Sequence, residues 1–464
     1  MRLAFVYPPQ EICPIAFTKK IYKHYSNVGA ILPPLGIAYL AAILEKKHMV
    51  KVVEGNALRL NVNEVIAELR IFRPDILLFS MLTANFQSDL RWIKELKKHI
   101  NAPIIVGGPQ ATLYPAEILT YHCIDFCVIG EGWETLPELI DCIETKGYFE
   151  GVKGIAYRKN GEVIVTGIRQ SKVTINNVPF PSRHLLPNEK YSTILSKKRP
   201  ITTMMSSEGC PFNCIYCSAN PDVVFRDPLK VVDEMEQCTT KYGIREILFY
   251  DEIFSLDKKR AMVICEEILR RKLDISWSIR TRPDCVNESL IKLFAKAGCI
   301  RINYGFESGD PQILKILKRD IPIAIMRDAV RWTRKENIDA FGFFMIGSPG
   351  ESKESIKKTI KLAKELDLDY VQFTKVTPSP HTELYRMVQE KIGGDFLRDY
   401  TLGKEDLENL KSVNLSISSD ELIYWLKNAY QSFYFRPRYI VRTLMKVKSF
   451  KELKGIIGSA CALI

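Results

Sequence analysis

Three cysteines in one short segment constrain this chain more than any other feature. Residues 209–217 read GCPFNCIYC, which gives the spacing C-x3-C-x2-C. Three thiolates on one loop can hold three irons of a 4Fe–4S cluster and leave the fourth iron open to another ligand. Three free core cysteines or a zinc loop are the alternatives. A zinc site usually needs a fourth Cys or His at matched spacing, whereas the next cysteine, Cys238, lies beyond two prolines. The spacing therefore favours an iron–sulfur cluster.

Length and cysteine usage place the chain in a reducing compartment. Its 464 residues are enough for roughly two or three domains. The 12 cysteines follow no signal-peptide pattern, which indicates thiols that serve metals rather than disulfides. No run of about 18 apolar residues occurs, so a membrane-spanning helix is not expected. We therefore expect a cytoplasmic protein.

The first 145 residues alternate between strand-like and helix-like patterns. Strand-like runs occupy residues 3–7, 51–54, 76–80, 104–106 and 126–129. Helical patterns occupy residues 36–47, 62–70, 86–99 and 115–121. This alternation predicts an α/β fold with a doubly wound parallel sheet, which binds ligands at the carboxyl ends of its strands.

The segment from residue 198 to about 385 repeats six strand–helix units. Its strands are predicted at residues 201–206, 247–250, 275–280, 300–308, 340–346 and 370–376. Six such units predict a partial (β/α)6 barrel with its chemistry at the carboxyl ends of the strands. The first strand would deliver the cysteine loop to that end, where polar residues also follow the other strands.

The cysteine loop resembles that of the radical S-adenosylmethionine (SAM) superfamily. The shared features are the cysteine spacing and the aromatic Tyr216 before the last cysteine. In that superfamily the free iron binds the amino and carboxylate groups of SAM, and an electron from the cluster cleaves SAM to a 5′-deoxyadenosyl radical. The resemblance implies that Cys210, Cys214 and Cys217 hold the cluster and that Tyr216 belongs to the SAM site.

Other strand ends carry residues that the same resemblance assigns to SAM, although each could be an ordinary polar turn. Asp251 and Glu252 stand where the family has a G-G-E-like segment, so one of the two is expected to hold the SAM ammonium group. Glu307, in G-F-E-S-G, stands in a segment that contacts SAM. A fixed guanidinium suits the SAM carboxylate, which points to Arg280 and Arg282. The G-S-P-G-E turn resembles the family's G-x-P-G-E turn, whose glycines leave backbone groups free for the adenosine. That turn contributes Gly347, Pro349 and Gly350.

The amino-terminal segment resembles the cobalamin-binding domain that precedes many radical SAM cores. The likeness rests on the P-P after the first strand, on PPLGIAYLA at residues 33–41, and on GGPQAT and GEGWETL at residues 107–112 and 130–136. It implies a cobalamin site between this sheet and the barrel. The implied residues are Pro8, Pro34, Leu35, Gly36, Ser80, Met81, Thr83, Gly107, Gly108, Gln110, Gly130, Glu131 and Gly132.

Two departures from the cobalamin-domain pattern affect this expectation. Gln110 stands where the family often has His, and the D-x-H-x-x-G motif that supplies a lower axial histidine is missing. Cobalamin is therefore expected to bind base-off, without a histidine from that motif. Because some relatives keep the fold without the cofactor, a purely structural domain is the alternative.

The predicted domain boundaries follow from the connector and from the end of the barrel. Two alternating runs flank Asn160-Gly161, which predicts a hairpin, and a proline-rich stretch follows at residues 178–183. We expect a cobalamin-binding-like domain at 1–148, a hairpin and linker at 149–195, a radical SAM core at 196–390 and a helical extension at 391–464. His381 stands where relatives commonly have a glycine, and it is either a proton relay or a turn residue.

The end of the chain combines basic side chains with an apolar terminus. Glu452 is the only acid in residues 436–464, whose basic residues are Arg436, Arg438, Arg442, Lys446, Lys448, Lys451 and Lys454. Such a stretch can lie on an anionic membrane, at the inner face, and suits a lipid substrate; it can equally be a helix that closes the barrel. The net charge of +12 is spread along the chain, and no nucleic-acid-binding motif occurs, so no nucleic-acid partner is expected.

Together the two resemblances predict a cobalamin-dependent radical SAM enzyme that methylates an unactivated carbon. The adenosyl radical would remove a hydrogen, methylcobalamin would supply the methyl group, and a protein such as flavodoxin or ferredoxin would supply electrons. The alternative is a radical cyclase, or a ring-forming or coupling enzyme, on the same scaffold without methyl transfer. A methylthiotransferase would need further cluster cysteines and an RNA-binding barrel, and neither is visible. No residue pattern identifies the substrate, a small molecule or a lipid, or the catalytic residues beyond the cofactor ligands.

Overall fold

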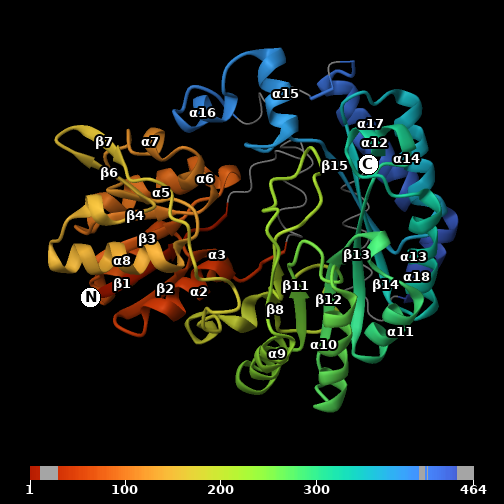
Figure 1. Cartoon of the computed structure of the whole chain (residues 1–464), viewed down its shortest axis with the longest axis horizontal. Coiled ribbons are helices and arrows are strands. Elements are labelled where there is room, and N and C mark those ends of the chain that lie inside the picture. Colours follow the sequence, from red (N-terminus) through yellow and green to blue (C-terminus); the bar gives the residue numbers. More distant parts are fainter. Residues whose placement is uncertain (11–29, 407–412, 415, 447–464) are drawn as a thin grey trace. The chain divides into compact units, whose positions relative to one another are not determined.

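The structure, a computed structural model, describes residues 1–10, 30–406, 413–414 and 416–446 (Figure 1). These residues divide into two compact units. The amino-terminal unit contains residues 1–10, 31–192 and 395–406, and the barrel unit contains residue 30, residues 193–394 and the described residues from 413 onward. The predicted extension at 391–464 is thus shared between the units. Among the described residues, no helix is long and apolar enough to cross a membrane.

The amino-terminal unit is built on a seven-stranded sheet with the order β2-β1-β3-β4-β5-β6-β7. Its strands are β1 (Arg2–Tyr7), β2 (Met49–Glu54), β3 (Ile76–Ser80), β4 (Ile104–Gly107), β5 (Phe126–Val128), β6 (Ile155–Lys159) and β7 (Glu162–Val165). The first five strands are parallel, which confirms the predicted doubly wound sheet. The hairpin predicted at Asn160-Gly161 also forms. Both residues have the positive φ that such a turn requires, and β6 adds to the sheet antiparallel to β5.

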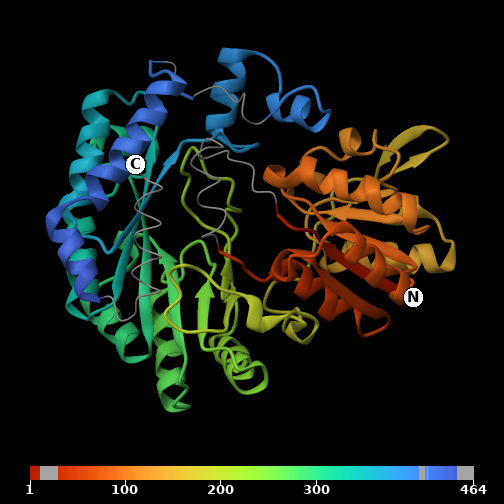
Figure 2. The ribbon, with the colours of Figure 1, turned by 180° about the vertical axis from the view of Figure 1, so that it is seen from behind.

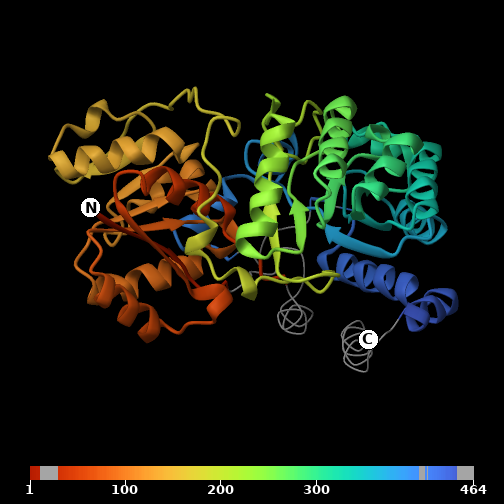
Figure 3. The same cartoon turned by 90° about the horizontal axis from the view of Figure 1, so that it is seen from below.

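Helices cover both faces of this sheet, as right-handed crossovers between parallel strands require (Figure 3). They are α2 (Leu35–Leu44), α3 (Gly55–Leu58), α4 (Val62–Phe72), α5 (Phe86–His99), α6 (Pro109–Leu113), α7 (Pro115–Ile118) and α8 (Gly132–Thr145). Helix α2 packs against α8, and α4 packs against α5. The first helix after each of the five parallel strands (α2, α3, α5, α6 and α8) follows the carboxyl end of its strand, so these helix starts lie along one edge of the sheet.

The barrel unit contains six parallel strands in the order β8-β11-β12-β13-β14-β15. They are β8 (Ile201–Met204), β11 (Glu246–Phe249), β12 (Ser276–Thr281), β13 (Cys299–Glu307), β14 (Asp339–Ile346) and β15 (Tyr370–Lys375). The helices between them are α9 (Pro228–Tyr242), α10 (Lys258–Arg270), α11 (Glu288–Lys296), α12 (Pro311–Ile316), α13 (Ile323–Lys335) and α14 (Lys353–Glu365). This arrangement confirms the predicted partial (β/α)6 barrel. Its core contains fully buried Phe254, Trp277 and Phe294, whose rings pack together.

The open edge of the barrel at β15 is covered by α17 (Ser419–Tyr434) (Figure 2). The Tyr430 hydroxyl accepts a hydrogen bond from the Phe373 N–H at 3.1 Å and donates one to the Phe373 carbonyl at 3.0 Å. Tyr434 pairs with Val371 in the same way. These hydroxyls satisfy backbone groups that an edge strand would otherwise leave unpaired. Helix α17 therefore closes this edge of the barrel, and α18 (Pro437–Lys446) follows it.

Candidate functional site

The cysteine loop leaves the carboxyl end of β8 and is closed at its base by a two-stranded ribbon. That ribbon pairs β9 (Ser207–Glu208) with β10 (Val224–Phe225). Gly209 follows with φ +84°, and a Cβ there would lie 2.1 Å from the Asp222 carbonyl oxygen. Only glycine fits this position. The Cys210 N–H donates to the Asn220 carbonyl at 2.8 Å, so both ends of the loop are fixed by backbone contacts.

Asp251 holds the start of this loop through hydrogen bonds. Its fully buried carboxylate accepts hydrogen bonds from the Ser206 N–H at 2.7 Å, the Ser206 hydroxyl at 2.5 Å and the Ser207 hydroxyl at 2.8 Å. Those bonds occupy Asp251, which the sequence offered as one of two candidates for the SAM ammonium group. Its neighbour Glu252 is exposed and close enough to Cys217 to raise the pKa of that thiol. Glu252 is the more exposed of the two carboxylates, and it accepts a hydrogen bond from the Gly209 backbone.

The three cysteines gather at the open side of the loop. Cys214 is buried, Cys210 is half-buried and Cys217 is exposed, and all three are free thiols. They interact electrostatically with one another: besides burial, the other two thiols raise the pKa of Cys210. Thiols of a cube-shaped cluster bind different irons, so they need to surround a space rather than meet at a point. The donor set fits a 4Fe–4S cluster with one open iron.

Arg282 places a buried positive charge beside the cysteine loop. Its guanidinium lies 3.6 Å from the ring centroid of Phe212, within the loop, and binds both oxygens of Asp284 at 3.0 and 2.8 Å. The side chain is 6% exposed, and its Nη1 has no hydrogen-bond partner among the described residues. A buried N–H without a partner is costly, and an anionic ligand group would satisfy it. Arg280 is instead half-buried over the ring of Tyr250.

Glu307 lies at a register shift between β13 and β14, in the left-handed region at φ +67°. It is 8% exposed, and burial raises the pKa of its carboxyl group, while a hydrogen bond from Tyr216 opposes that rise. The structure thus brings together two residues that the sequence assigned to SAM. Backbone strain of this kind persists only where the surrounding structure holds it, and it clusters at ligand sites.

Arg319 joins Glu307 to the cysteine loop, and the sequence analysis missed it. Its Nη1 donates to Cys214 Sγ at 3.7 Å, its Nη2 donates to the Gly305 carbonyl at 2.7 Å, and its Nε lies 3.6 Å from Glu307 Oε1. A Cβ at Gly305 would lie 2.6 Å from both Arg319 Nη2 and Glu307 Oε1, so the glycine makes room for the ion pair. Three basic residues within five positions gave no local sign of which one is buried.

The G-S-P-G-E turn uses backbone groups that were expected to serve adenosine. The N–H groups of Gly347 and Ser348 donate to Glu351 Oε2 at 2.6 and 3.1 Å. The Gly347 amide is therefore not free for a ligand, and Pro349 and Gly350 form the more exposed part of the turn. His381 is exposed with φ +61°, which matches a glycine-type turn position and supports its interpretation as a turn residue.

The cobalamin-type loops lie along the carboxyl edge of the amino-terminal sheet. Pro8 follows β1, Pro34 to Gly36 begin α2, and Gly130 to Gly132 lead into α8. Ser80 ends β3 and its loop continues to Thr83, and Gly107 ends β4 and its loop continues to Gln110. The β3 and β4 loops interlock. Met81 N–H donates to the Gly107 carbonyl at 2.8 Å, and Gln110 N–H donates to the Met81 carbonyl at 3.2 Å.

Glycines in these loops leave open space and close contact in different places. A Cβ on Gly36 or Gly130 would meet nothing within 4 Å, which leaves room for a large flat group to approach the backbone. At Gly108, with φ +90°, a Cβ would lie 2.9 Å from the Met81 carbonyl oxygen. The side chains of Met81 and Gln110 have no exposed surface, so they support the loops from within. This edge fits the predicted cofactor.

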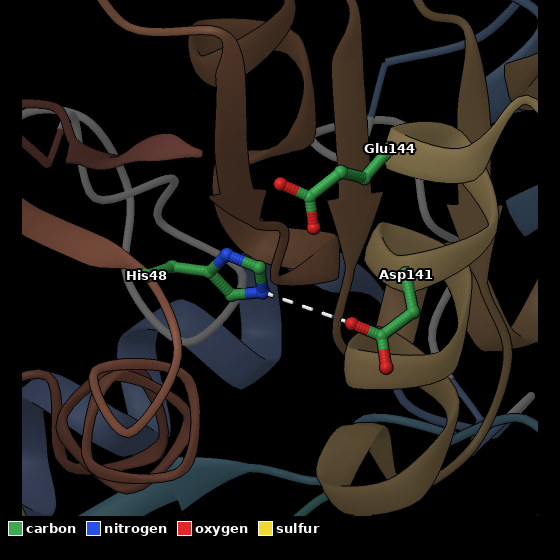
Figure 4. Close-up of side chains that lie close together, drawn as sticks. All are labelled: His48, Asp141 and Glu144. Atoms are coloured by element: carbon green, nitrogen blue, oxygen red, sulfur yellow. Dashed lines mark ion pairs between the residues drawn. The ribbon is translucent and has the colours of Figure 1, made fainter.

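His48, Asp141 and Glu144 form a further cluster of groups that often bind metals, at the amino-terminal end of β1 and β2 (Figure 4). Cations already neutralise it. The Met1 ammonium lies 3.3 Å from His48 Nδ1 and 3.5 Å from Glu144, and Lys47 binds Asp141 at 2.9 Å. Burial and that ammonium lower the pKa of His48. The cluster is therefore explained by its contacts with the Met1 ammonium group and Lys47.

Comparison with known proteins identifies both units. Residues 204–363 match the family described as the radical SAM superfamily, and residues 25–140 match the B12 binding domain. An uncharacterized methyltransferase of Pyrococcus horikoshii is 34% identical over 467 residues, which span 99% of this chain and 98% of the relative. The chain belongs to the cobalamin-binding radical SAM family.

Two further similarities place this radical SAM protein among its relatives. The anaerobic magnesium-protoporphyrin IX monomethyl ester cyclase of Rubrivivax gelatinosus is 27% identical over 390 residues, covering 80% of this chain and 70% of the cyclase. The solved structure of the cobalamin-dependent SAM radical enzyme OxsB with aqua-cobalamin bound has the same fold. Its TM-score is 0.73 at 19% identity, covering all of this chain and 72% of OxsB.

Family membership confirms the cofactors that the sequence predicted: a 4Fe–4S cluster, SAM and cobalamin. As a radical SAM enzyme the protein needs an external reductant and acts on a substrate of its own. The individual residues that bind each cofactor remain predictions, which the geometry above refines.

Proposed function

We propose that this radical SAM protein methylates an unactivated carbon of its substrate in a cobalamin-dependent reaction. The observation that carries the proposal is the pairing of a radical SAM segment with a B12-binding segment, in a chain that aligns almost end to end with a relative named as a methyltransferase. When bound, the cluster and SAM supply a hydrogen-abstracting radical, and cobalamin supplies a carrier for the methyl group.

In this proposal the barrel unit holds the cluster and SAM through charged groups. Cys210, Cys214 and Cys217 bind three irons. The Nη1 of Arg282 binds the SAM carboxylate, because a guanidinium donates to a carboxylate with matched geometry. Glu252, the exposed carboxylate beside Cys217, accepts from the SAM ammonium group.

The amino-terminal unit holds cobalamin through backbone groups in this proposal. The loops after β3, β4 and β5 present few charged side chains, and those after β4 and β5 contain glycine turns. Because the D-x-H-x-x-G motif is missing, no histidine from it ligates the cobalt, and the cofactor binds base-off. Glu131, whose pKa is raised by burial, lies at the start of α8 and is the ionisable side chain among the predicted cobalamin residues.

A radical cyclase or coupling reaction is the second candidate function. The similarity to the Rubrivivax gelatinosus cyclase favours it, because that relative matches 80% of this chain. Both candidates use the same radical, and they differ in whether the methyl group of SAM is transferred.

Anaerobic reconstitution of the full chain separates these candidates without a known substrate. The protein would be loaded with iron, sulfide, SAM and hydroxocobalamin, and titanium citrate would serve as the reductant. Methyl transfer predicts two SAM products: 5′-deoxyadenosine, which requires the cluster, and S-adenosylhomocysteine, which forms only when cobalamin is present. Deoxyadenosine without cobalamin-dependent S-adenosylhomocysteine would favour the cyclase or coupling reaction. The absence of both products would contradict radical SAM chemistry altogether.

The finer proposal on location is that α18 contacts an anionic membrane from which a lipid substrate is drawn. One side of α18 exposes four apolar side chains at 40–76%, namely Ile440, Val441, Leu444 and Met445. Arg438 is 86% exposed and lies 3.7 Å from Asp367, which Arg442 binds at 3.0 Å. Basic residues near an anionic surface contribute about 1 kcal/mol each.

Flotation of the full chain with phosphatidylglycerol vesicles tests this contact. A variant in which Val441, Leu444 and Met445 are all replaced by Ser should not float. Phosphatidylcholine vesicles should not bind the unaltered protein. The matched control replaces Ile71 and Ile168, each 80% exposed in the amino-terminal unit, with Ser. Equal flotation of the α18 variant and this control, or no binding by the unaltered chain at low salt, would end the proposal.

A further inference from the structure

The short helix α16 (Phe396–Thr401) follows the barrel in sequence but belongs to the amino-terminal unit. Leu397, Tyr400 and Thr401 are almost fully buried there. The ring of Tyr400 packs edge-on against Phe86, with 6.1 Å between centroids. Figures 1 and 2 both show α16 beside the helices that follow β3 and β4. Such burial makes α16 an integral part of this unit.

Hydrogen bonds from several elements hold α16 in place. Tyr114 OH donates to Asp395 Oδ1 at 2.9 Å, and Tyr121 OH donates to the Thr401 carbonyl at 2.8 Å. Gln87 Nε2 donates to the Tyr400 carbonyl at 2.9 Å. The donors follow β3 and β4, the strands whose loops interlock at the cobalamin-type edge. The helix is therefore anchored to the elements that carry those loops.

One of these contacts reaches the β4 loop itself. Gln110 Nε2 donates to Thr401 Oγ1 at 2.5 Å, and both side chains are fully buried. The Thr401 hydroxyl in turn donates to the Leu397 carbonyl at 2.7 Å, which fixes its orientation. Gln110 Oε1 is buried without a hydrogen-bond partner among the described residues. Thr401 is thus the contact that orients the Gln110 carboxamide.

We propose that Thr401 is a positioning residue for cobalamin, because its hydroxyl holds Gln110 and, through Gln110, the interlocked loops 80–83 and 107–110. The inference rests on the proposed function. The corrin ring carries amide side chains, and backbone groups that are already held in fixed positions bind such groups at a lower entropic cost. A segment nearly 300 residues distant in sequence therefore completes the cobalamin site that the B12-binding segment begins.

The test compares Thr401→Val with Thr401→Ser in the full reconstituted chain. Valine keeps the shape and loses the hydroxyl, whereas serine keeps the hydroxyl. Loss of one buried hydrogen bond predicts roughly 5- to 10-fold weaker binding of hydroxocobalamin to Thr401→Val, measured by equilibrium dialysis. Binding by Thr401→Ser should stay within about 2-fold of the unaltered chain. Amide hydrogen exchange at residues 107–113 should be faster in the valine variant alone.

Thr166→Val is the matched control. Thr166 is also buried, and its hydroxyl also accepts one hydrogen bond and donates one, with Ile155 at 3.0 and 3.1 Å, but it lies in the hairpin region. Its replacement should leave cobalamin binding unchanged. In a Gln110→Leu background, Thr401→Val should have no further effect, because the contact is already lost.

The outcomes distinguish this inference from the proposed function. Unchanged binding by Thr401→Val, or an equal loss in Thr166→Val, would overturn the inference and leave cobalamin dependence intact. Additive losses in the double variant would also overturn it. If the unaltered chain retains no cobalamin after gel filtration, both the inference and the proposed function fail.

Discussion

The carboxyl edges of the two sheets present different kinds of chemical group. The barrel edge gathers buried charges around three thiols, with Arg282, Arg319 and Glu307 each less than 12% exposed. The edge of the amino-terminal sheet presents glycine turns and mostly uncharged side chains instead, with Glu54 and Glu131 as ionisable groups. SAM is small and carries charges, whereas cobalamin is large and fringed by amides. Each edge therefore matches the chemistry of the cofactor assigned to it.

Loss of the thiols should produce the largest effect and should be confined to the barrel edge. Replacing all three cysteines, Cys210, Cys214 and Cys217, with Ala is expected to abolish the visible absorbance of the cluster and deoxyadenosine formation, because the irons lose their ligands. Cobalamin binding should persist, since the other edge is untouched. Cys238→Ala, at a fully buried cysteine in α9, is the control and should keep the cluster. SAM cleavage by the triple variant would refute the assignment.

The charged edge should also depend on individual guanidinium groups. Arg282→Met is expected to weaken SAM binding roughly 10- to 100-fold, because a charged hydrogen bond in a buried site is lost. Arg280→Met should have a smaller effect, since Arg280 is half-buried and stacks on Tyr250. Isothermal titration of the cluster-loaded chain with SAM measures both. An effect of Arg280→Met equal to or larger than that of Arg282→Met would reverse the assignment.

The backbone-built edge should respond to added side-chain volume rather than to lost charge. Gly108→Ala would place a Cβ 2.9 Å from the Met81 carbonyl oxygen at φ +90°, so it is expected to cost roughly 1–3 kcal/mol of stability and to disrupt the interlocked loops. Thermal unfolding and cobalamin retention measure this change. Gly161→Ala, at φ +87° with open space around it, separates backbone strain from steric clash. Comparable losses of cobalamin in both variants would contradict a local role for Gly108.

The sequence predicted the cysteine loop of the charged edge because motifs record local spacing, whereas two other features of that edge were not predicted. Cys210, Cys214 and Cys217 lie within one loop, and short apolar runs in the sequence indicate the strands. The role of Arg319 was not predicted because its burial depends on contacts with Gly305 and Cys214, which are not its neighbours in sequence. The role of the Gly347 turn was also predicted wrongly. Its N–H group donates to the Glu351 carboxylate, and the motif does not specify the orientation of that side chain.

The packing of α16 against the amino-terminal unit could not be predicted from any sequence pattern. Helix α16 is a short segment without strong periodicity, and nothing local to residues 395–401 indicates contact with residues 86–121. The hydrogen bond between Gln110 and Thr401 joins positions 291 apart. Secondary structure was therefore accessible from periodicity, whereas the assignment of a segment to one unit or the other required its tertiary contacts.

The smallest expected difference between the two edges lies in their response to pH. Each edge contains one buried glutamate whose pKa is raised by burial to about 7, Glu54 after β2 and Glu351 after β14. Between the ordinary value of 4.5 and about 7, the folded state binds more protons than the unfolded state, so stability falls as pH rises through this window. The loss is on the order of 1–3 kcal/mol per group.

Glu54→Gln and Glu351→Gln should each flatten the decline in thermal stability between pH 5 and 7. Glu351 accepts two backbone N–H bonds, which favour its charged form, whereas Glu54 accepts one, from Ala57 at 2.6 Å. The Glu54 variant is therefore expected to flatten the profile more, and the opposite order would show that those hydrogen bonds do not offset burial.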